Sequence, residues 1–267
     1  MNRNDRRLVW KAHCLGVALL LVLGPLSLPA SSQKTAHSPD DPLARLMAGN
    51  ARFAKGRHRP ANYKSERAEL TKGQHPYAIV LSCSDSRVPP EIVFDESLGR
   101  LFVVRVAGNV VDPATLGSIE YAAEHLHSKM LYVLGHESCG AVKATVDGGH
   151  FSPSIESIVE KIKPAVAAAR RDHPNAKDLL PFAVRENVAV QIKSIVDQSD
   201  TLREMIEKRE LRIAGGVYRL DSGKVDFSPE ELYRVALTEN PRVNLERETA
   251  QKLRPQMPQR GLTSCQI

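Results

Sequence analysis

Long cationic runs and clusters of aromatic residues are both missing from this chain of 267 residues. Aromatic side chains make up 5% of it, and no stretch of Lys and Arg is interleaved with them. The formal net charge is +6, and residues 1–32, with four basic and one acidic side chain, contribute +3 of it. The remaining mild excess has none of the clustering that nucleic-acid binding requires. We therefore predict no nucleic-acid partner.

Also missing is an apolar run of the roughly 20 residues that a membrane-spanning helix needs. The apolar stretch 14–28 is shorter and contains Pro25; basic residues precede it and Ala30-Ser31-Ser32 follows it. This order is typical of a secretory signal peptide. We predict that residues 1–32 are removed, and that the mature protein is periplasmic or secreted and meets a membrane only through this segment. Arg6-Arg7 fits either a twin-arginine signal, for export in the folded state, or an ordinary basic start.

Cysteine is rare, and no Cys-x-x-Cys pair is present. Four cysteines in an exported protein would suggest two disulfides. However, Cys14 leaves with the signal peptide, and Cys265 stands alone in a polar tail, where we expect a free thiol. Cys83 and Cys139 are far apart in sequence and each lies in a context typical of metal ligands, which argues against a thiol redox protein.

The periodicity predicts one α/β domain over residues 42–228, without internal repeats. Helical segments are expected from Pro42, which follows Asp41, and at 64–72, 114–126, 154–169, 182–198 and 200–208. Buried parallel strands are expected at 77–82, 101–106, 130–135 and 211–218. This alternation predicts a central, mostly parallel sheet flanked by helices on both faces, with an N-terminal helical arm. We expect residues 33–41 to form a disordered linker and residues 229–267 a C-terminal extension.

Three potential metal ligands follow the predicted strands. Cys83 ends the first strand, while His136 and Cys139 follow the third, and the carboxyl ends of parallel strands are where ligands bind in open sheets. Two thiolates and one imidazole suit Zn²⁺, and three protein ligands leave one coordination position open, as in catalytic zinc sites. A helix starting at Gly140 would direct its positive end at the Cys139 thiolate. The sequence therefore predicts one zinc ion per chain.

Asp85 and Arg87 lie beside the first of these ligands. Zinc acidifies a bound water, but two thiolates donate more electron density than imidazoles do and should weaken this effect. An oriented hydrogen-bond acceptor would then matter more. We expect Asp85 to accept a hydrogen bond from the hydroxide, and Arg87 to hold Asp85 in a bidentate pair that keeps it ionised.

These motifs resemble those of the β-class carbonic anhydrases, whose patterns Cys-x-Asp-x-Arg and His-x-x-Cys-Gly occur here as Cys83-Ser84-Asp85-Ser86-Arg87 and His136-Glu137-Ser138-Cys139-Gly140. The similarity runs from about residue 74 to residue 227. It implies a β-carbonic anhydrase-like fold and reversible hydration of CO₂ to bicarbonate and a proton, by attack of a zinc-bound hydroxide. It also implies a homodimer or homotetramer with the active site at the subunit interface.

The resemblance further implies a substrate pocket. Gln74 falls where the family often has a glutamine that contacts substrate, Phe102 and Tyr121 match aromatic pocket positions, and Gly108 belongs to a substrate-binding Gly-Asn pair of one branch. Without the resemblance, Gln74 would be a solvated loop residue and the two aromatics core residues. In the bicarbonate-gated subclass, the aspartate at the position of Asp85 can move onto the zinc as a fourth ligand, and a tryptophan lies three residues before the first cysteine. That position is Val80 here, which favours the open-site form.

Two other functions stay open. Carbon disulfide and carbonyl sulfide hydrolases share this fold and metal set, and the sequence does not separate their linear substrates from CO₂. The second alternative is a non-catalytic zinc-binding protein that retains the fold. The presence of both Asp85 and Arg87 argues against it.

Overall fold

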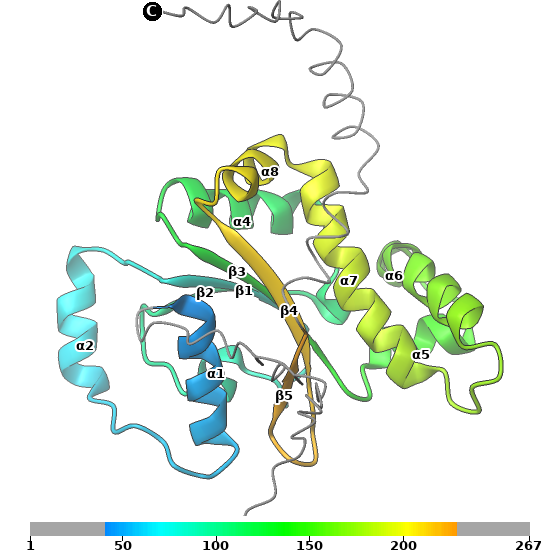
Figure 1. Cartoon of the computed structure of the whole chain (residues 1–267), viewed down its shortest axis with the longest axis horizontal. Helices are drawn as coiled ribbons and strands as arrows, with labels where there is room; N and C mark the ends of the chain where they lie inside the picture. The colour runs from blue at the N-terminus through cyan, green and yellow to red at the C-terminus, as the bar shows by residue number, and fades with distance from the viewer. Residues whose placement is uncertain (1–40, 229–267) are drawn as a thin grey trace, which may run out of the picture. The chain divides into compact units, whose positions relative to one another are not determined.

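The computed structural model of the chain describes residues 41–228, which contain a five-stranded sheet flanked by helices (Figure 1). The order of the strands across the sheet is β2-β1-β3-β4-β5. The first four strands pair in parallel and β5 pairs antiparallel with β4. The strands are β1 Ala78–Ser82, β2 Leu101–Arg105, β3 Met130–His136, β4 Arg212–Tyr218 and β5 Val225–Phe227. The predicted mostly parallel sheet is confirmed, whereas β5 is an additional strand that the sequence pattern did not indicate.

Helices fill the segments before and between the strands. The predicted ones are present as α1 Pro42–Phe53, α2 Tyr63–Glu69 with the 3-10 turn η1 Leu70–Lys72, α4 Pro113–Glu124, α6 Pro153–Asp172, α7 Leu180–Gln198 and α8 Asp200–Glu207. The helix expected to start at Gly140 is α5 Gly140–Asp147. Two short elements were not predicted, α3 Pro90–Val93 and the 3-10 turn η2 Ala107–Asn109.

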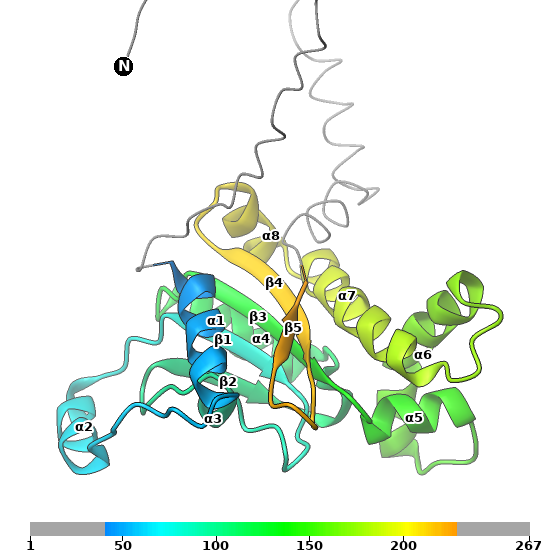
Figure 2. The ribbon, with the colours of Figure 1, turned by 60° about the horizontal axis from the view of Figure 1, so that its bottom comes forward.

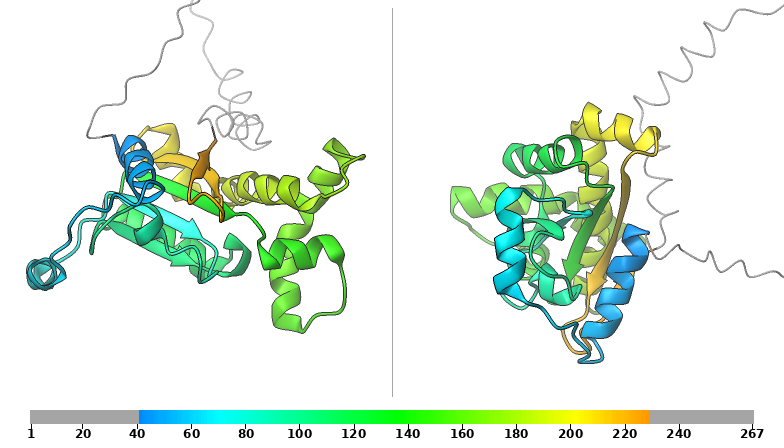
Figure 3. Two further views of the ribbon diagram at one scale, coloured as in Figure 1. Left: turned by 90° about the horizontal axis from the view of Figure 1, so that it is seen from below. Right: turned by 90° about the vertical axis from the view of Figure 1, so that its left-hand side faces the viewer.

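The two faces of the sheet carry different helices (Figure 3). The connections from β2 to β3 and from β3 to β4 run in the same direction across the sheet, and right-handed crossovers therefore put α4 and α7 on one face. The connection from β1 to β2 runs the other way and leaves α3 on the opposite face. There α1 packs near α3 and β5, and Phe94 makes an edge-on contact with Tyr132 of β3.

Helix α7 approaches the sheet closely because glycines face it. A Cβ atom at Gly215 in β4 would lie 2.5 Å from Val188 Cγ1 and 2.8 Å from the carbonyl oxygen of Val133. A Cβ atom at Gly135 in β3 would lie 2.7 Å from Val188 Cγ2. The absence of side chains at both positions thus fixes how deeply α7 sits on β3 and β4.

The N-terminal arm is attached through its first helix. Pro42 is the first residue of α1 and Asp41 caps it, accepting a hydrogen bond of 2.8 Å from the Ala44 amide. Arg45 forms a bidentate pair with the buried carboxylate of Glu96, with both distances 2.8 Å. Helix α2, in contrast, has no buried residue, and Figure 2 shows it standing apart from the sheet.

Several predictions concern residues outside the described range 41–228. They are the signal peptide 1–32, nearly all of the linker 33–41, the C-terminal extension 229–267, and the cysteines Cys14 and Cys265. Among the residues that the structure does describe, no helix combines the length and the apolar character that crossing a membrane requires.

Close packing of α1 against the α3 region leads to a stability prediction. A Cβ atom at Gly49 would lie 1.8 Å from the carbonyl oxygen of Phe94, which is backbone and cannot move aside on its own. We expect Gly49→Ala to lower the free energy of unfolding by about 1–3 kcal/mol. Urea denaturation of both proteins measures this difference.

The matched control is Gly117→Ala in α4, where an added Cβ would meet nothing within 4 Å. Because alanine favours a helix over glycine, this change should leave the protein equally stable or raise the free energy of unfolding by up to about 1 kcal/mol. Equal effects of the two substitutions would show that the contact of Gly49 with Phe94 does not constrain α1.

Candidate metal centre

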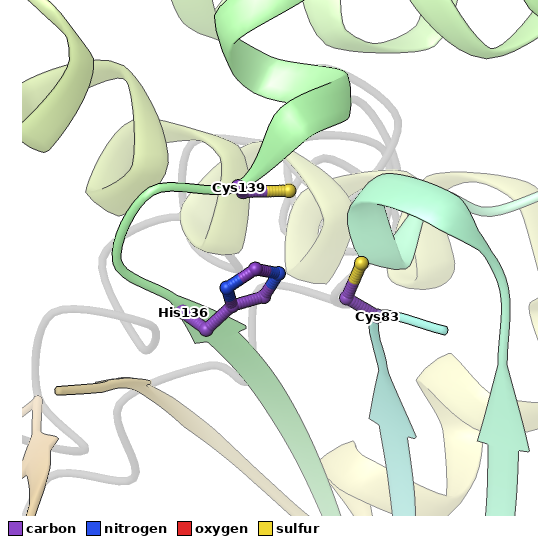
Figure 4. A group of neighbouring side chains, drawn as sticks. All are labelled: Cys83, His136 and Cys139. Atoms are coloured by element: carbon purple, nitrogen blue, oxygen red, sulfur yellow. The ribbon is translucent and has the colours of Figure 1, made fainter. Parts of the chain in front are cut away.

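The structure brings the side chains of Cys83, His136 and Cys139 together at the carboxyl edge of the sheet. Their Sγ and ring nitrogen atoms all lie within 4.8 Å of one another. Cys83 directly follows β1, His136 is the last residue of β3, and Cys139 is the N-cap of α5. Figure 4 shows the two sulfur atoms and the imidazole ring converging on one space. All three residues are buried.

The backbone leaves one nitrogen of His136 available as a ligand. Nδ1 lies 2.8 Å from the carbonyl oxygen of Glu137, and because a carbonyl oxygen only accepts, Nδ1 carries the proton. Nε2 is buried and has no hydrogen-bond partner among the described residues. A metal-binding histidine has this arrangement, in which a hydrogen bond at one nitrogen fixes the tautomer and orients the ring.

The thiols of Cys83 and Cys139 shift each other's pKa values in opposite directions. A hydrogen bond from the Cys139 thiol lowers the pKa of Cys83 to about 4, although burial opposes this. The same interaction with Cys83, together with burial, raises the pKa of Cys139. Burial is the largest single effect on His136 and lowers its pKa, but the interactions with Cys83, the Glu137 carbonyl and Asp85 together raise it. The Cys83 thiol therefore ionises more readily than the Cys139 thiol, and a bound divalent cation would favour ionisation of both.

Backbone amides and an arginine hold Cys83 in place. The Gly108 amide donates a hydrogen bond of 3.3 Å to Cys83 Sγ. Arg105, at the end of β2, donates to the carbonyl oxygens of Cys83 and Asp85, at 3.1 and 2.7 Å. No sequence pattern indicates this role of Arg105, since its contacts are with the backbone of a segment about 20 residues away in the chain.

Asp85 and Arg87 form the expected bidentate pair. Arg87 Nε lies 2.9 Å from Asp85 Oδ1, and Nη2 lies 2.7 Å from Oδ2. The Arg87 amide adds a third bond, of 3.0 Å, to Oδ1. The hydrogen bonds from Arg87 hold the pKa of the Asp85 carboxyl well below its usual range, against the opposing effect of burial. Asp85 Oδ2 is 3.8 Å from His136 Nε2, so the carboxylate faces the cluster.

The residues assigned to the substrate pocket are not all at this centre. Gly108 lies at the centre, because its backbone amide donates a hydrogen bond to Cys83 Sγ. Gln74 is exposed and precedes β1, and the strand that separates it from Cys83 spans roughly 17 Å. Phe102 and Tyr121 lie near each other, with ring centroids 6.3 Å apart. In register Phe102 is opposite Ile79, three positions before Ser82. Within one chain, these three side chains thus lie away from the cluster.

The donor set of the cluster fits Zn²⁺. Two sulfur atoms and one imidazole nitrogen are the ligand types of known zinc sites, and they leave a fourth tetrahedral position for water or substrate. The buried and unpartnered Nε2 of His136 points to the same conclusion, because an orphaned polar atom in the interior destabilises the protein unless a ligand satisfies it.

Comparison with known proteins agrees with the geometry. A family model described as carbonic anhydrase matches residues 78–225, more than half of the chain. The chain belongs to the β-carbonic anhydrase family. Carbonic anhydrase 2 of Mycobacterium tuberculosis is 41% identical over 189 residues, which cover 67% of this chain and 87% of the relative. The carbonic anhydrase of Mycolicibacterium smegmatis is 39% identical over 187 residues, which cover 68% and 89% of the two chains.

Among solved structures, the β-carbonic anhydrase CcaA is 28% identical and superimposes with a TM-score of 0.54. The superposition covers 70% of this chain and 91% of CcaA. Membership of the carbonic anhydrases confirms the resemblance that the motifs indicated, the fold class, and the prediction of an enzyme with this activity.

The cluster predicts which cysteines determine metal content. We expect Cys139→Ala to reduce bound zinc to less than about a tenth of the wild-type content, because removing one ligand leaves a site of two donors. The matched control is Cys265→Ala, which removes a cysteine predicted to be a free thiol and should leave the zinc content unchanged. Elemental analysis of the purified proteins measures both. Full zinc in Cys139→Ala would refute its assignment as a ligand.

Proposed function

We propose that this β-carbonic anhydrase hydrates CO₂ reversibly to bicarbonate and a proton, using one zinc ion held by Cys83, His136 and Cys139. The convergence of these three donors beside the carboxylate of Asp85 is the observation that carries the proposal. Membership of the carbonic anhydrase family supports it.

Zinc bound to these ligands would acidify a water molecule and so supply a nucleophile near neutral pH. The residues of the chain orient that reaction. Asp85 lies on the open side of the cluster and stays ionised, so it can accept a hydrogen bond from the attacking water and aim the water's lone pair at the carbon of CO₂. Arg87 holds both carboxylate oxygens and prevents Asp85 from rotating.

The pairing of Asp85 with Arg87 supports the open-site form of the enzyme. For Asp85 to become a fourth metal ligand, its carboxylate would have to leave a bidentate pair and the Arg87 amide. The side chain at the position of the gating tryptophan is Val80, which is fully buried within β1. We therefore propose that the fourth coordination position stays available for water and substrate across the physiological pH range.

The positions of Gln74, Phe102 and Tyr121 support an assembly of at least two subunits. None of these side chains reaches the cluster of its own chain, so they can line a substrate pocket only next to the centre of a neighbouring subunit. Tyr121 is 49% exposed, β2 is an edge strand, and α2 buries no residue. We propose a homodimer or homotetramer, and light scattering that finds a monomer would refute it.

We also propose that the enzyme works in the periplasm or outside the cell. The basic start, the short apolar stretch and the small residues of segment 1–32 support this. N-terminal mass analysis of the protein from its native host distinguishes a cleaved chain beginning near residue 33 from an uncleaved one. Replacing Arg6 and Arg7 by lysine should block export by the twin-arginine route and leave the ordinary route intact.

The central test is CO₂ hydration followed by stopped flow with residues 33–267, at pH values from 6.5 to 9. We expect rapid hydration with about one zinc per chain, persisting at mildly acid pH because Asp85 remains with Arg87. Activity that collapses below about pH 8 would contradict the open-site form. Full zinc without hydration at any pH would contradict the proposed reaction and would favour a carbon disulfide or carbonyl sulfide hydrolase, or a non-catalytic zinc protein.

Asp85 provides a second test. We expect Asp85→Ala to lower kcat about 10- to 100-fold while the zinc content stays at one per chain, because the residue orients the reacting water without holding the metal. Asp147→Ala is the control, since this exposed acid pairs only with Lys143 one turn away on α5 and should leave kcat unchanged. Loss of zinc in Asp85→Ala would show instead that Asp85 is a ligand, as in the gated form.

A further inference from the structure

Two buried amide side chains on α7, Asn187 and Gln191, are connected to the metal centre by hydrogen bonds. Neither belongs to a motif that the sequence pattern singles out. We propose that Asn187 and Gln191 are positioning residues, which hold the Gly108 amide against the Cys83 sulfur and thereby set the zinc affinity of the centre. This inference rests on the zinc site of the proposed function and adds to it the residues that tune the metal.

The contact to be positioned is the hydrogen bond from the Gly108 amide to Cys83 Sγ, 3.3 Å long. Gly108 lies in η2 with a φ of 71°, a backbone conformation that favours glycine. A Cβ atom at Gly108 would lie 2.8 Å from Ile162 Cδ1 and 3.1 Å from Ala141 Cβ. The turn is therefore pressed between the metal centre and the helices α5 and α6, and a small displacement would break the bond to sulfur.

Asn187 holds this turn from the other side. Its Nδ2 donates a hydrogen bond of 2.8 Å to the carbonyl oxygen of Gly108, the same residue whose amide reaches the sulfur. Asn187 is 1% exposed, so no water competes for this bond. Gly108 is thus fixed at both of its backbone polar groups, by Cys83 at one and by Asn187 at the other.

Gln191, one turn further along α7, completes the network. Its Nε2 donates to Asn187 Oδ1 and to the carbonyl oxygen of Lys161, both at 3.1 Å. Its Oε1 accepts a hydrogen bond of 2.9 Å from the Val111 amide, just beyond η2. Two side chains one turn apart on α7 therefore hold this segment at Gly108, within η2, and at Val111, just beyond it.

This arrangement bears on the metal because a peptide N–H stabilises the charge of a thiolate ligand without occupying a coordination position. Outer partners of metal ligands typically change metal affinity 10- to 100-fold when they are removed. A fully paired and buried amide network also fixes geometry strongly, since breaking one bond leaves other polar atoms unsatisfied. The main-chain amide of Gly108 cannot be removed by substitution, so its role is tested by substituting Asn187 and Gln191.

The test compares Asn187→Leu, which removes the bond to Gly108 at similar volume, with Gln198→Leu at the exposed end of α7. Gln198 bonds only to Ser194 on its own helix. Zinc affinity is measured by competition with a chelator, and the charge-transfer absorption from sulfur to metal is recorded after cobalt replaces zinc. We expect 10- to 100-fold weaker zinc binding and a shift of the absorption to longer wavelength in Asn187→Leu, and neither change in Gln198→Leu.

Gln191→Glu guards against a folding defect in the leucine variant. It keeps the shape of the side chain and an acceptor for the Val111 amide, and burial favours the neutral carboxylic acid, which has one O–H donor in place of two N–H donors. We therefore expect a smaller shift in the same direction. A purely structural role would lower the free energy of unfolding but leave the cobalt absorption unchanged. An unchanged spectrum and zinc affinity within twofold of wild type, in the variants that fold, would overturn the inference. A wild-type chain that binds no zinc would instead overturn the proposed function.

Discussion

The parallel pairing of β1 with β3 is the contact on which the proposed metal centre depends. Ser82 is opposite Leu134 in this register, so β3 extends two residues further and ends at His136. Cys83 and His136, more than 50 residues apart in the chain, are thereby delivered to the same edge of the sheet. Both strands are buried at every position, and a slip by one residue would exchange the side chains of the two faces. It would then break face-specific contacts such as that of Tyr132 with Phe94 and that of Gly135 with Val188. Packing of the core thus specifies the position of two proposed metal ligands.

Burial of this cluster links the proposed metal to folding. Without a cation, the interaction between the two thiols lowers the pKa of Cys83 and raises that of Cys139, and Nε2 of His136 has no hydrogen-bond partner among the described residues. A divalent cation would satisfy all three groups at once, and its binding free energy would contribute directly to the stability of the folded chain. The pair of Asp85 and Arg87 requires no such cation, because the guanidinium is partly exposed and supplies the compensating charge.

Local patterns in the sequence predicted most of the fold and all three clustered donors. Strands β1 to β4 and the long helices have clear apolar periods, and Cys83 and His136 stand directly at strand ends. The sequence did not predict β5 and α3 because they are too short to show a period: β5 has three residues, two of them not fully buried, and α3 has four. The roles of Arg105, Asn187 and Gln191 were not predicted for another reason. Each acts on the backbone of a distant segment, and a bond from a side chain to a main chain leaves no pattern in the sequence.

The glycines beneath α7 also bear on the proposed metal centre. Gly215 and Gly135 determine the depth of the helix at Val188, and the residue just before Val188 is Asn187, which anchors the turn that carries Gly108. A methyl group added at Gly135 or Gly215 would push α7 away from the sheet. Asn187 would move with the helix, and its bond to Gly108 would displace the Gly108 amide from the Cys83 sulfur. The spacing between the sheet and α7 therefore helps to set the position of the Gly108 amide beside the Cys83 sulfur.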